Sequence, residues 1–154
     1  MPHDLGIFDN VNPDFFSYSI SSVDVSEILT GRPYGGLTIL WRKNIAHTCR
    51  ITTFDDDRLL GLQIECDSRK ILAINVYLPY QSEDNIDLYV FYIGKFASIF
   101  EESDSSDLFI LGDFNAPLGG RFFREWQGVC VDYDLVFFRM YPAYLFHHIR
   151  ILIH

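Results

Sequence analysis

The sequence has 154 residues, 49% of them hydrophobic and 16% aromatic, with a formal net charge of −9. This length fits one domain or a large piece of one, the hydrophobic content excludes a mainly disordered chain, and the many rings favour a sheet-rich interior and exclude a coiled coil. The negative charge argues against broad electrostatic attraction to nucleic acid, so any contact with a polyanion has to be local.

The first part of the chain predicts irregular structure and then a strand. Residues 1–30 mix Asn, Asp, Ser and Pro with scattered rings, which indicates short, irregular structure. Residues 31–36, Gly-Arg-Pro-Tyr-Gly-Gly, are typical of a turn. Residues 37–43 are rich in Leu, Ile and Trp and predict a strand.

A hairpin and a central strand are predicted next. Residues 48–54 and 58–66 are expected to form antiparallel strands joined through the acidic turn 55–57. Three neighbouring carboxylates can hold a hard divalent cation, but a solvated turn is the favoured interpretation. Residues 70–78 are almost continuously apolar, as in a strand covered on both faces, and Pro79 ends it.

The pattern then changes to helical spacing. Ser82 is a candidate cap, and apolar residues recur from there at helical spacing up to residue 100. Residues 108–111 predict a short buried strand, residues 121–127 a second, short helix, and residues 135–137 a further strand. The order strand, helix, strand is that of an α/β domain.

The run Gly112-Asp113-Phe114-Asn115 directly follows the strand predicted at 108–111. Side chains at such a turn leave the sheet edge and face a crevice. A carboxylate there can activate a water, transfer a proton to a leaving oxygen or help hold Mg²⁺, and an Asn amide can donate to a phosphate oxygen. Asp113 and Asn115 are therefore candidate phosphate-handling residues.

Two observations bear on this interpretation in opposite directions. Gly, Asp and Asn are the usual turn formers, so the run taken alone is better explained as a turn. Tyr77, however, lies at the end of the preceding predicted strand, so its hydroxyl is expected to reach the same crevice. Ordinary packing explains Tyr77 equally well, and we keep it as the third candidate site residue.

Three segments occur in the order found in a known family: Gly31–Lys43 (GRPYGGLTILWRK), Ile74–Pro79 (INVYLP) and Leu108–Ala116 (LFILGDFNA). They resemble the endonuclease/exonuclease/phosphatase superfamily, and in particular the endonuclease domains encoded by non-long-terminal-repeat retrotransposons. The resemblance covers Asp4 to Phe137.

This resemblance implies a four-layered α/β sandwich, in which two mixed sheets pack face to face with helices outside. It also implies cleavage of phosphodiesters with Mg²⁺ or Mn²⁺, and DNA as the partner. By resemblance, Asp113 activates or orients the nucleophile, Asn115 contacts the phosphate, and Tyr77 is the active-site tyrosine.

Basic residues with aromatic neighbours can line a path for a DNA backbone. Solvated arginines are the simpler interpretation. Arg42 and Lys43 fall on opposite faces of the predicted strand, so at most one of them serves a common groove. The residues considered are Arg32, Arg42, Lys43, Arg121 and Arg124, with Trp41 and Trp126.

The sequence also departs from the family. The family begins with strands that carry an Asn and a metal-binding Glu, and it ends with Ser-Asp-His; neither strand is found here, and no Asp-His dipeptide occurs. We therefore expect a partial sandwich in which the N-terminal strands and the C-terminal strand are missing. The predicted function is a divalent-metal-dependent, endonuclease-like phosphodiester hydrolase that is inactive as given. The alternatives are a non-catalytic remnant of a retrotransposon reading frame and a phosphatase of the same superfamily.

The composition changes late in the chain. All 21 acidic residues lie at or before Asp134, whereas the residues after it include two Arg and three His. Residues 1–137 are expected to form the partial domain, and residues 138–154 a divergent, non-homologous tail. His147 and His148 are poor substitutes for the family's His, because neighbours on a strand face opposite ways and no acid follows to orient them.

Three cysteines, Cys49, Cys66 and Cys130, have no Cys-x-x-Cys spacing, so neither a disulfide framework nor a zinc site is predicted. The N-terminus lacks the basic flank and apolar run of a secretion signal, and no segment reaches the roughly 18 apolar residues of a membrane span. We expect a soluble, intracellular protein, nuclear or cytoplasmic.

Overall fold

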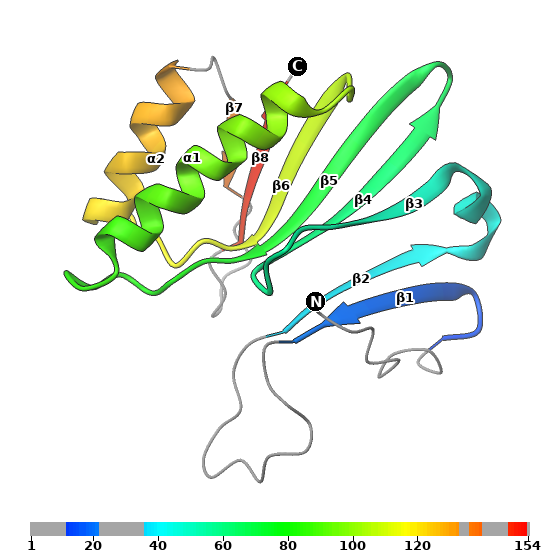
Figure 1. Ribbon diagram of the computed structural model, residues 1–154, viewed down its shortest axis with the longest axis horizontal. Helices are drawn as coiled ribbons and strands as arrows, with labels where there is room; N and C mark the ends of the chain where they lie inside the picture. Colours follow the sequence, from blue (N-terminus) through cyan, green and yellow to red (C-terminus); the bar gives the residue numbers. More distant parts are fainter. Residues whose placement is uncertain (1–11, 22–35, 133–135, 140–147, 154) are drawn as a thin grey trace, which may run out of the picture.

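The computed structural model describes residues 12–21, 36–132, 136–139 and 148–153, the last two segments by their backbone alone. Within these residues the predicted α+β fold with two sheets is confirmed (Figure 1). The elements are β1 (Phe15–Ile20), β2 (Leu37–Arg42), the 3₁₀ helix η1 (Lys43–Thr48), β3 (Cys49–Thr53), β4 (Leu59–Cys66), β5 (Arg69–Tyr77), α1 (Ile86–Glu102), β6 (Asp107–Asp113), α2 (Arg121–Asp132), β7 (Val136–Arg139) and β8 (His148–Ile153).

Six strands form a mixed sheet in the order β3-β4-β5-β6-β8-β7. The predicted hairpin of β3 and β4 is confirmed, and β5 is a central strand as expected. β5 and β6 are parallel and are joined in sequence by α1, whereas the other neighbours are antiparallel. Because β5 and β6 run in the same direction, their carboxyl ends meet at one edge of the sheet.

The other sheet has two antiparallel strands, β1 and β2. It packs against the six-stranded sheet through a small apolar cluster in which Ile20, Leu37 and Leu60 are buried. Tyr77, at the end of β5, packs against the same cluster. The face of β5 that carries Tyr77 is therefore the face toward the two-stranded sheet.

β1 corrects the expectation that residues 1–30 are irregular. Residues 15–20 pair one to one with β2, from Phe15 opposite Arg42 to Ile20 opposite Leu37. The signal was present in the sequence, because apolar residues at 16, 18 and 20 alternate with serines, which is the period of a half-buried strand. The predicted strand 37–43 ends one residue early, where η1 begins.

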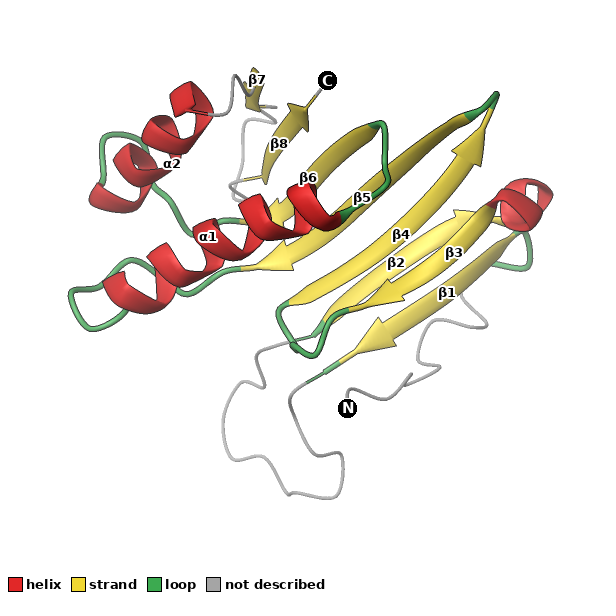
Figure 2. Ribbon diagram, turned by 45° about the horizontal axis from the view of Figure 1, so that its top comes forward, coloured by secondary structure: helices red, strands yellow, loops and turns green. Residues whose placement is uncertain are grey.

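Both α-helices cover the other face of the six-stranded sheet (Figure 2), so the described layers are helix, sheet and sheet. The main core joins aliphatic residues of β4, β5 and β6 to rings from the helices. The buried helix residues are Tyr89, Tyr92, Ile93 and Phe96 on α1 and Phe122 and Trp126 on α2. Three of the four layers expected for the sandwich are thus described.

The helix boundaries differ from the prediction. α1 begins at Ile86, and Ser82 lies in the turn before it, where its hydroxyl oxygen accepts the N–H of Asn85 at 3.2 Å. Ser82 therefore organises the turn instead of capping the helix. α2 begins as predicted but continues to Asp132. Neither described helix is long and apolar enough to span a membrane.

Part of the expected tail joins the sheet. β8 lies between β6 and β7 and pairs antiparallel with both, and β7 includes the strand predicted around residue 136. That residues 138–154 are not homologous to the family stays a prediction. Of the predicted turn at 31–36, residues 31–35 lie outside the described part of the chain.

Candidate functional site

Tyr77 and Asp113 lie side by side at one edge of the six-stranded sheet. They are the last residues of β5 and β6, and they pair with each other in the parallel ladder. Paired residues of neighbouring strands project from the same face, and here that face looks toward the two-stranded sheet. Both residues are half-buried. The structure thus brings two of the three predicted site residues together.

Gly112 allows β6 to end this close to β5. Its φ of +131° lies in a region that residues with a side chain rarely adopt. A Cβ at Gly112 would also overlap the carbonyl oxygen of Val76 and would lie 2.8 Å from the Val76 nitrogen. The backbone geometry next to Asp113 therefore requires glycine.

Asn115 reaches across to the segment that follows β5. Its side-chain nitrogen donates to the carbonyl oxygen of Leu78 at 2.7 Å, and the Leu78 N–H donates to the Asp113 carbonyl at 2.9 Å. Its own N–H donates to Asp113 Oδ1 at 3.0 Å, which is an Asx turn, and its φ of +47° is one that Asn tolerates. The turn and the candidate site are therefore the same structure, and the second amide hydrogen of Asn115 is not used in these bonds.

Arg58 extends this arrangement to a third strand, although the sequence analysis did not single it out. It lies directly before β4, where its carbonyl accepts the Tyr77 N–H at 3.1 Å. One nitrogen of its guanidinium donates to the Tyr77 carbonyl at 3.2 Å, and the guanidinium carbon lies 5.7 Å from the centroid of the Tyr77 ring. We call Arg58, Tyr77 and Asp113 the strand-end row.

The acidic turn before Arg58 is held by α1. Asp56, whose side chain is 8% exposed, accepts a hydrogen bond from Lys95 at 2.7 Å. It also accepts the Tyr92 hydroxyl at 3.2 Å and the Arg58 backbone N–H at 2.8 Å. Burial, and then the Asp56 charge, raise the pKa of Tyr92, which therefore stays a donor. The Asp56 carboxylate thus fixes the entry to β4. Residues 55–57 precede β4 in a turn as interpreted, but Asp56 is buried and paired and not solvated as expected.

Three buried rings fix the loop after β6. The Trp126 indole N–H donates to the Tyr89 hydroxyl at 2.6 Å, and that hydroxyl donates to the Phe114 carbonyl at 2.9 Å. Trp126 packs edge-on against Phe114, with ring centroids 4.9 Å apart. The Asp113 to Asn115 turn is thus attached to both helices, a connection that the sequence analysis did not predict.

The described residues offer few ligands for the metal ion that the resemblance implies. Within the described residues, no three His, Cys, Asp or Glu side chains gather closely enough to hold a metal. Mg²⁺ is usually bound through one or two carboxylates together with water and substrate phosphate. The strand-end row offers the single carboxylate of Asp113, the lower end of that range, so Asp113 would hold Mg²⁺ or Mn²⁺ only together with water and substrate phosphate.

β8 brings His148 to the same edge of the sheet. Its backbone pairs with that of Asp113 in the antiparallel ladder. The sequence analysis set His148 aside because no acid follows it, and the structure describes His148 by its backbone alone. His147 lies outside the described residues.

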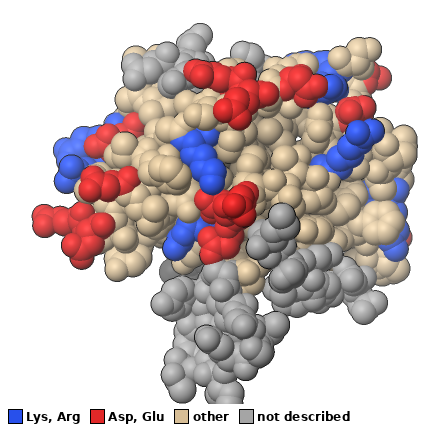
Figure 3. Space-filling view, viewed as in Figure 1, with Lys and Arg blue, Asp and Glu red and all other residues tan. Residues whose placement is uncertain are grey.

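Of the predicted basic path, the described residue Arg42 lies away from the strand-end row. Thr38, near the start of β2, accepts the Asn75 side-chain amide at 3.1 Å, so the start of β2 lies by the end of β5. Arg42 lies four residues further, about 13 Å along the strand, over the ring of Phe15 at 5.5 Å. On the face in Figure 3, acidic and basic groups are interspersed. Arg121 and Arg124 are exposed on α2, and Arg32 lies outside the described residues.

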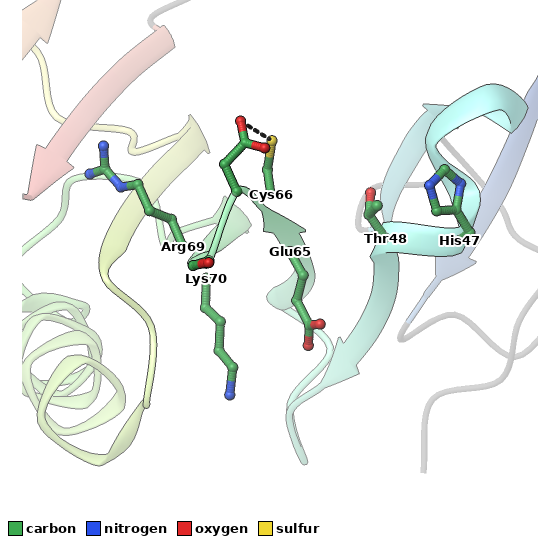
Figure 4. Close-up of a pocket in the computed structure, with 8 residues that line it drawn as sticks. His47, Thr48, Glu65, Cys66, Arg69 and Lys70 are labelled. Atoms are coloured by element: carbon green, nitrogen blue, oxygen red, sulfur yellow. Dashed lines mark hydrogen bonds between the residues drawn. The ribbon is translucent and has the colours of Figure 1, made fainter.

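A pocket of about 310 Å³ lies at the opposite end of the sheet, between η1 and the β4–β5 hairpin (Figure 4). Its two basic residues are already paired, Arg69 with Asp107 and Lys70 with Asp104. Its lining residues are His47, Thr48, Glu65, Cys66, Asp67, Ser68, Arg69 and Lys70. None of these is a predicted site residue, so this pocket and the strand-end row are separate features.

The sequence matches no protein-family model and no curated protein. Solved structures do share the fold. The human Nocturnin catalytic domain with bound sulfate matches with a TM-score of 0.60 at 10% identity, over 96% of this chain and 65% of that one. An endonuclease/exonuclease/phosphatase family protein from Bacteroides thetaiotaomicron matches with a TM-score of 0.59 at 11% identity, over 94% and 63%.

A mannosyl-6-phosphatase from the same bacterium matches with a TM-score of 0.58 at 11% identity, over 94% of this chain and 65% of that one. The chain thus spans slightly less than two thirds of the length of these proteins. At such identities the likeness concerns the fold alone. The fold is that of endonuclease/exonuclease/phosphatase family proteins.

Proposed function

We propose that this chain is a phosphodiester hydrolase of the endonuclease type that acts on DNA, with the strand-end row as its phosphate-handling part. The observation that carries the proposal is the juxtaposition of a cation, a phenol and a carboxylate at the ends of three neighbouring strands. The shared fold supports it, as do the three segments that resemble retrotransposon endonucleases.

Each member of the row has a distinct chemical role in this proposal. Arg58 carries a permanent charge and five N–H donors that suit a phosphate group. The Tyr77 hydroxyl donates to a phosphate oxygen, and the second amide hydrogen of Asn115 does the same. Asp113 accepts the proton of the attacking water or returns a proton to the leaving oxygen.

Dependence on Mg²⁺ or Mn²⁺ belongs to this proposal on the strength of the sequence resemblance. The test is incubation of the purified chain with supercoiled plasmid DNA in Mg²⁺, in Mn²⁺ and in EDTA. We expect nicked circles in either metal and none in EDTA. This differs from the inactivity expected from the sequence, because the structure adds Arg58 to Tyr77 and Asp113. A folded sample that leaves the plasmid intact in both metals contradicts the proposal.

Two other functions are each favoured by one observation. The likeness to a mannosyl-6-phosphatase favours a phosphatase, and the single carboxylate of the row favours a non-catalytic protein of the same fold. A paired assay with bis-p-nitrophenyl phosphate and p-nitrophenyl phosphate separates them. We expect cleavage of the diester; cleavage of the monoester alone indicates a phosphatase, and cleavage of neither indicates the non-catalytic protein.

Replacing Arg58 by Gln should weaken the binding of DNA. A hydrogen bond to a charged group contributes about 1.5–3 kcal/mol, so we expect KM for DNA to rise roughly 10- to 100-fold while kcat changes less. Arg58→Lys should fall in between, because it keeps the charge but loses the planar fork. The readout is steady-state nicking kinetics.

Arg50→Gln is the matched control for this experiment. Arg50 lies exposed on β3, paired with Gln63 well along β4 from Arg58. Its replacement removes the same charge from the protein without touching the strand-end row. Equal KM values in the two variants would mean that Arg58 acts only through the net charge of the chain.

A further inference from the structure

The Phe114–Asn115 peptide group takes part in hydrogen bonds at both of its ends. Its carbonyl oxygen accepts the Tyr89 hydroxyl at 2.9 Å. Its N–H, which belongs to Asn115, donates to Asp113 Oδ1 at 3.0 Å. A peptide group is planar and conjugated, so the two bonds act on one rigid unit. A contact made inside the core is thereby joined to the carboxylate of the strand-end row.

Trp126 fixes the direction of this chain of hydrogen bonds. An indole N–H can only donate, so the Tyr89 oxygen accepts the hydrogen bond from Trp126 at 2.6 Å. The Tyr89 hydroxyl in turn donates its hydrogen bond to the Phe114 carbonyl. Tyr89, Trp126 and Phe114 are each 0% exposed. Burial also raises the pKa of Tyr89, which keeps its hydroxyl protonated.

We propose that Tyr89 and Trp126 are positioning residues that hold the Asp113 carboxylate in place through the Phe114–Asn115 peptide; the catalytic part of this inference rests on the function proposed above. Hydrogen bonds in series polarise one another, so donation to the carbonyl strengthens the N–H as a donor to Asp113. Neither residue touches substrate in this scheme.

The surrounding rings explain why this arrangement holds a precise geometry. Tyr89 stacks on Phe122 with ring centroids 3.8 Å apart, and Trp126 packs against both Phe96 and Phe114. Close packing leaves these rings few alternative rotamers. A half-buried carboxylate at a strand end thus has its support in the closely packed core of the protein.

Tyr89→Phe removes the hydroxyl and keeps the ring. We expect the amide of Asn115 to exchange its hydrogen about tenfold faster, because loss of a neutral hydrogen bond weakens the next one in the series. We expect kcat for DNA nicking to fall about tenfold with KM within about twofold, since the substrate contacts remain. Hydrogen exchange measured by NMR and steady-state kinetics give the two readouts.

Ile93→Val is the control, because it trims the same helix one turn further on without touching the turn at Asp113. Ile93 is 6% exposed in the same core, so its truncation lowers stability but leaves the hydrogen bonds intact. We expect neither readout to change. Exchange at Asn115 that is unaltered by Tyr89→Phe, or equally fast in both variants, overturns the positioning role.

The two proposals fail separately. If the wild-type chain does not cleave DNA, the proposed function is wrong, while exchange at Asn115 still decides whether Tyr89 fixes the turn. If Tyr89→Phe does not fold, the NMR signal of the Tyr89 hydroxyl proton in the wild-type protein replaces the comparison of variants. We expect a separate, slowly exchanging resonance for it, and a proton that exchanges as fast as one in solvent overturns the inference.

Discussion

Asp113→Asn is expected to lower the rate of DNA nicking roughly 10²- to 10⁴-fold, the usual contribution of a general acid or base. Asn has the same shape and keeps an oxygen that can accept the Asn115 N–H, so the Asx turn should persist. The charge and the ability to take a proton are lost. Because Tyr77 and Arg58 are untouched, the loss should appear in kcat.

Asp104→Asn provides the matched control. Asp104 is 69% exposed in its side chain and pairs with Lys70 at the opposite end of the sheet. The same chemical change there should leave nicking within about twofold, because surface ion pairs contribute little. Thermal unfolding followed by circular dichroism confirms that both variants are folded. An Asp113→Asn protein that retains half of the wild-type kcat would remove Asp113 from the reaction.

Gly112→Ala is expected to destabilise the protein by about 2–6 kcal/mol. The positive φ costs roughly 1–3 kcal/mol for a residue with a Cβ, and the overlap with Val76 roughly another 1–3 kcal/mol. A domain of this size is stable by about 5–15 kcal/mol, so we expect the variant to lose a large share of its stability. Urea denaturation measures the difference.

Gly94→Ala should raise the free energy of unfolding, whereas Gly112→Ala should lower it. Gly94 lies exposed in the middle of α1, and a Cβ there meets no atom within 4 Å. Alanine in an exposed helix interior is more stable than glycine by about 0.5–1 kcal/mol. Equal unfolding free energies for Gly112→Ala and the wild type would mean that the ends of β5 and β6 can separate at no cost.

The sequence predicted the elements whose pattern is local. The apolar run of β5, the helical spacing of α1 and the turn after β6 each carry their own signal, and from them followed the expectation that Tyr77 reaches the crevice at Asp113. Arg58 was not predicted as a site residue. In the structure a two-residue turn at 67–68 sets the register of the β4–β5 hairpin, and this register places residue 58 opposite residue 77. That register depends on the turn type, which the apolar pattern does not reveal.

Other parts of the site depend on contacts that no local pattern specifies. Tyr89 was not singled out, and Trp126 was considered only for contact with DNA, because their hydrogen bonds exist only once two helices pack together. β8 was assigned to a divergent tail because of composition. Its pairing with β6 joins residues far apart in the chain, which composition does not encode.

The position of β8 between β6 and β7 has a consequence for synthesis on the ribosome. β8 follows β7 in the chain, yet it occupies the place beside β6. While the chain is being made, β6 can pair with β5 but keeps an open edge until residues 148–153 emerge. An unpaired edge is a template for pairing with another chain. Nascent chains halted before β8 should therefore depend on chaperones more than complete ones.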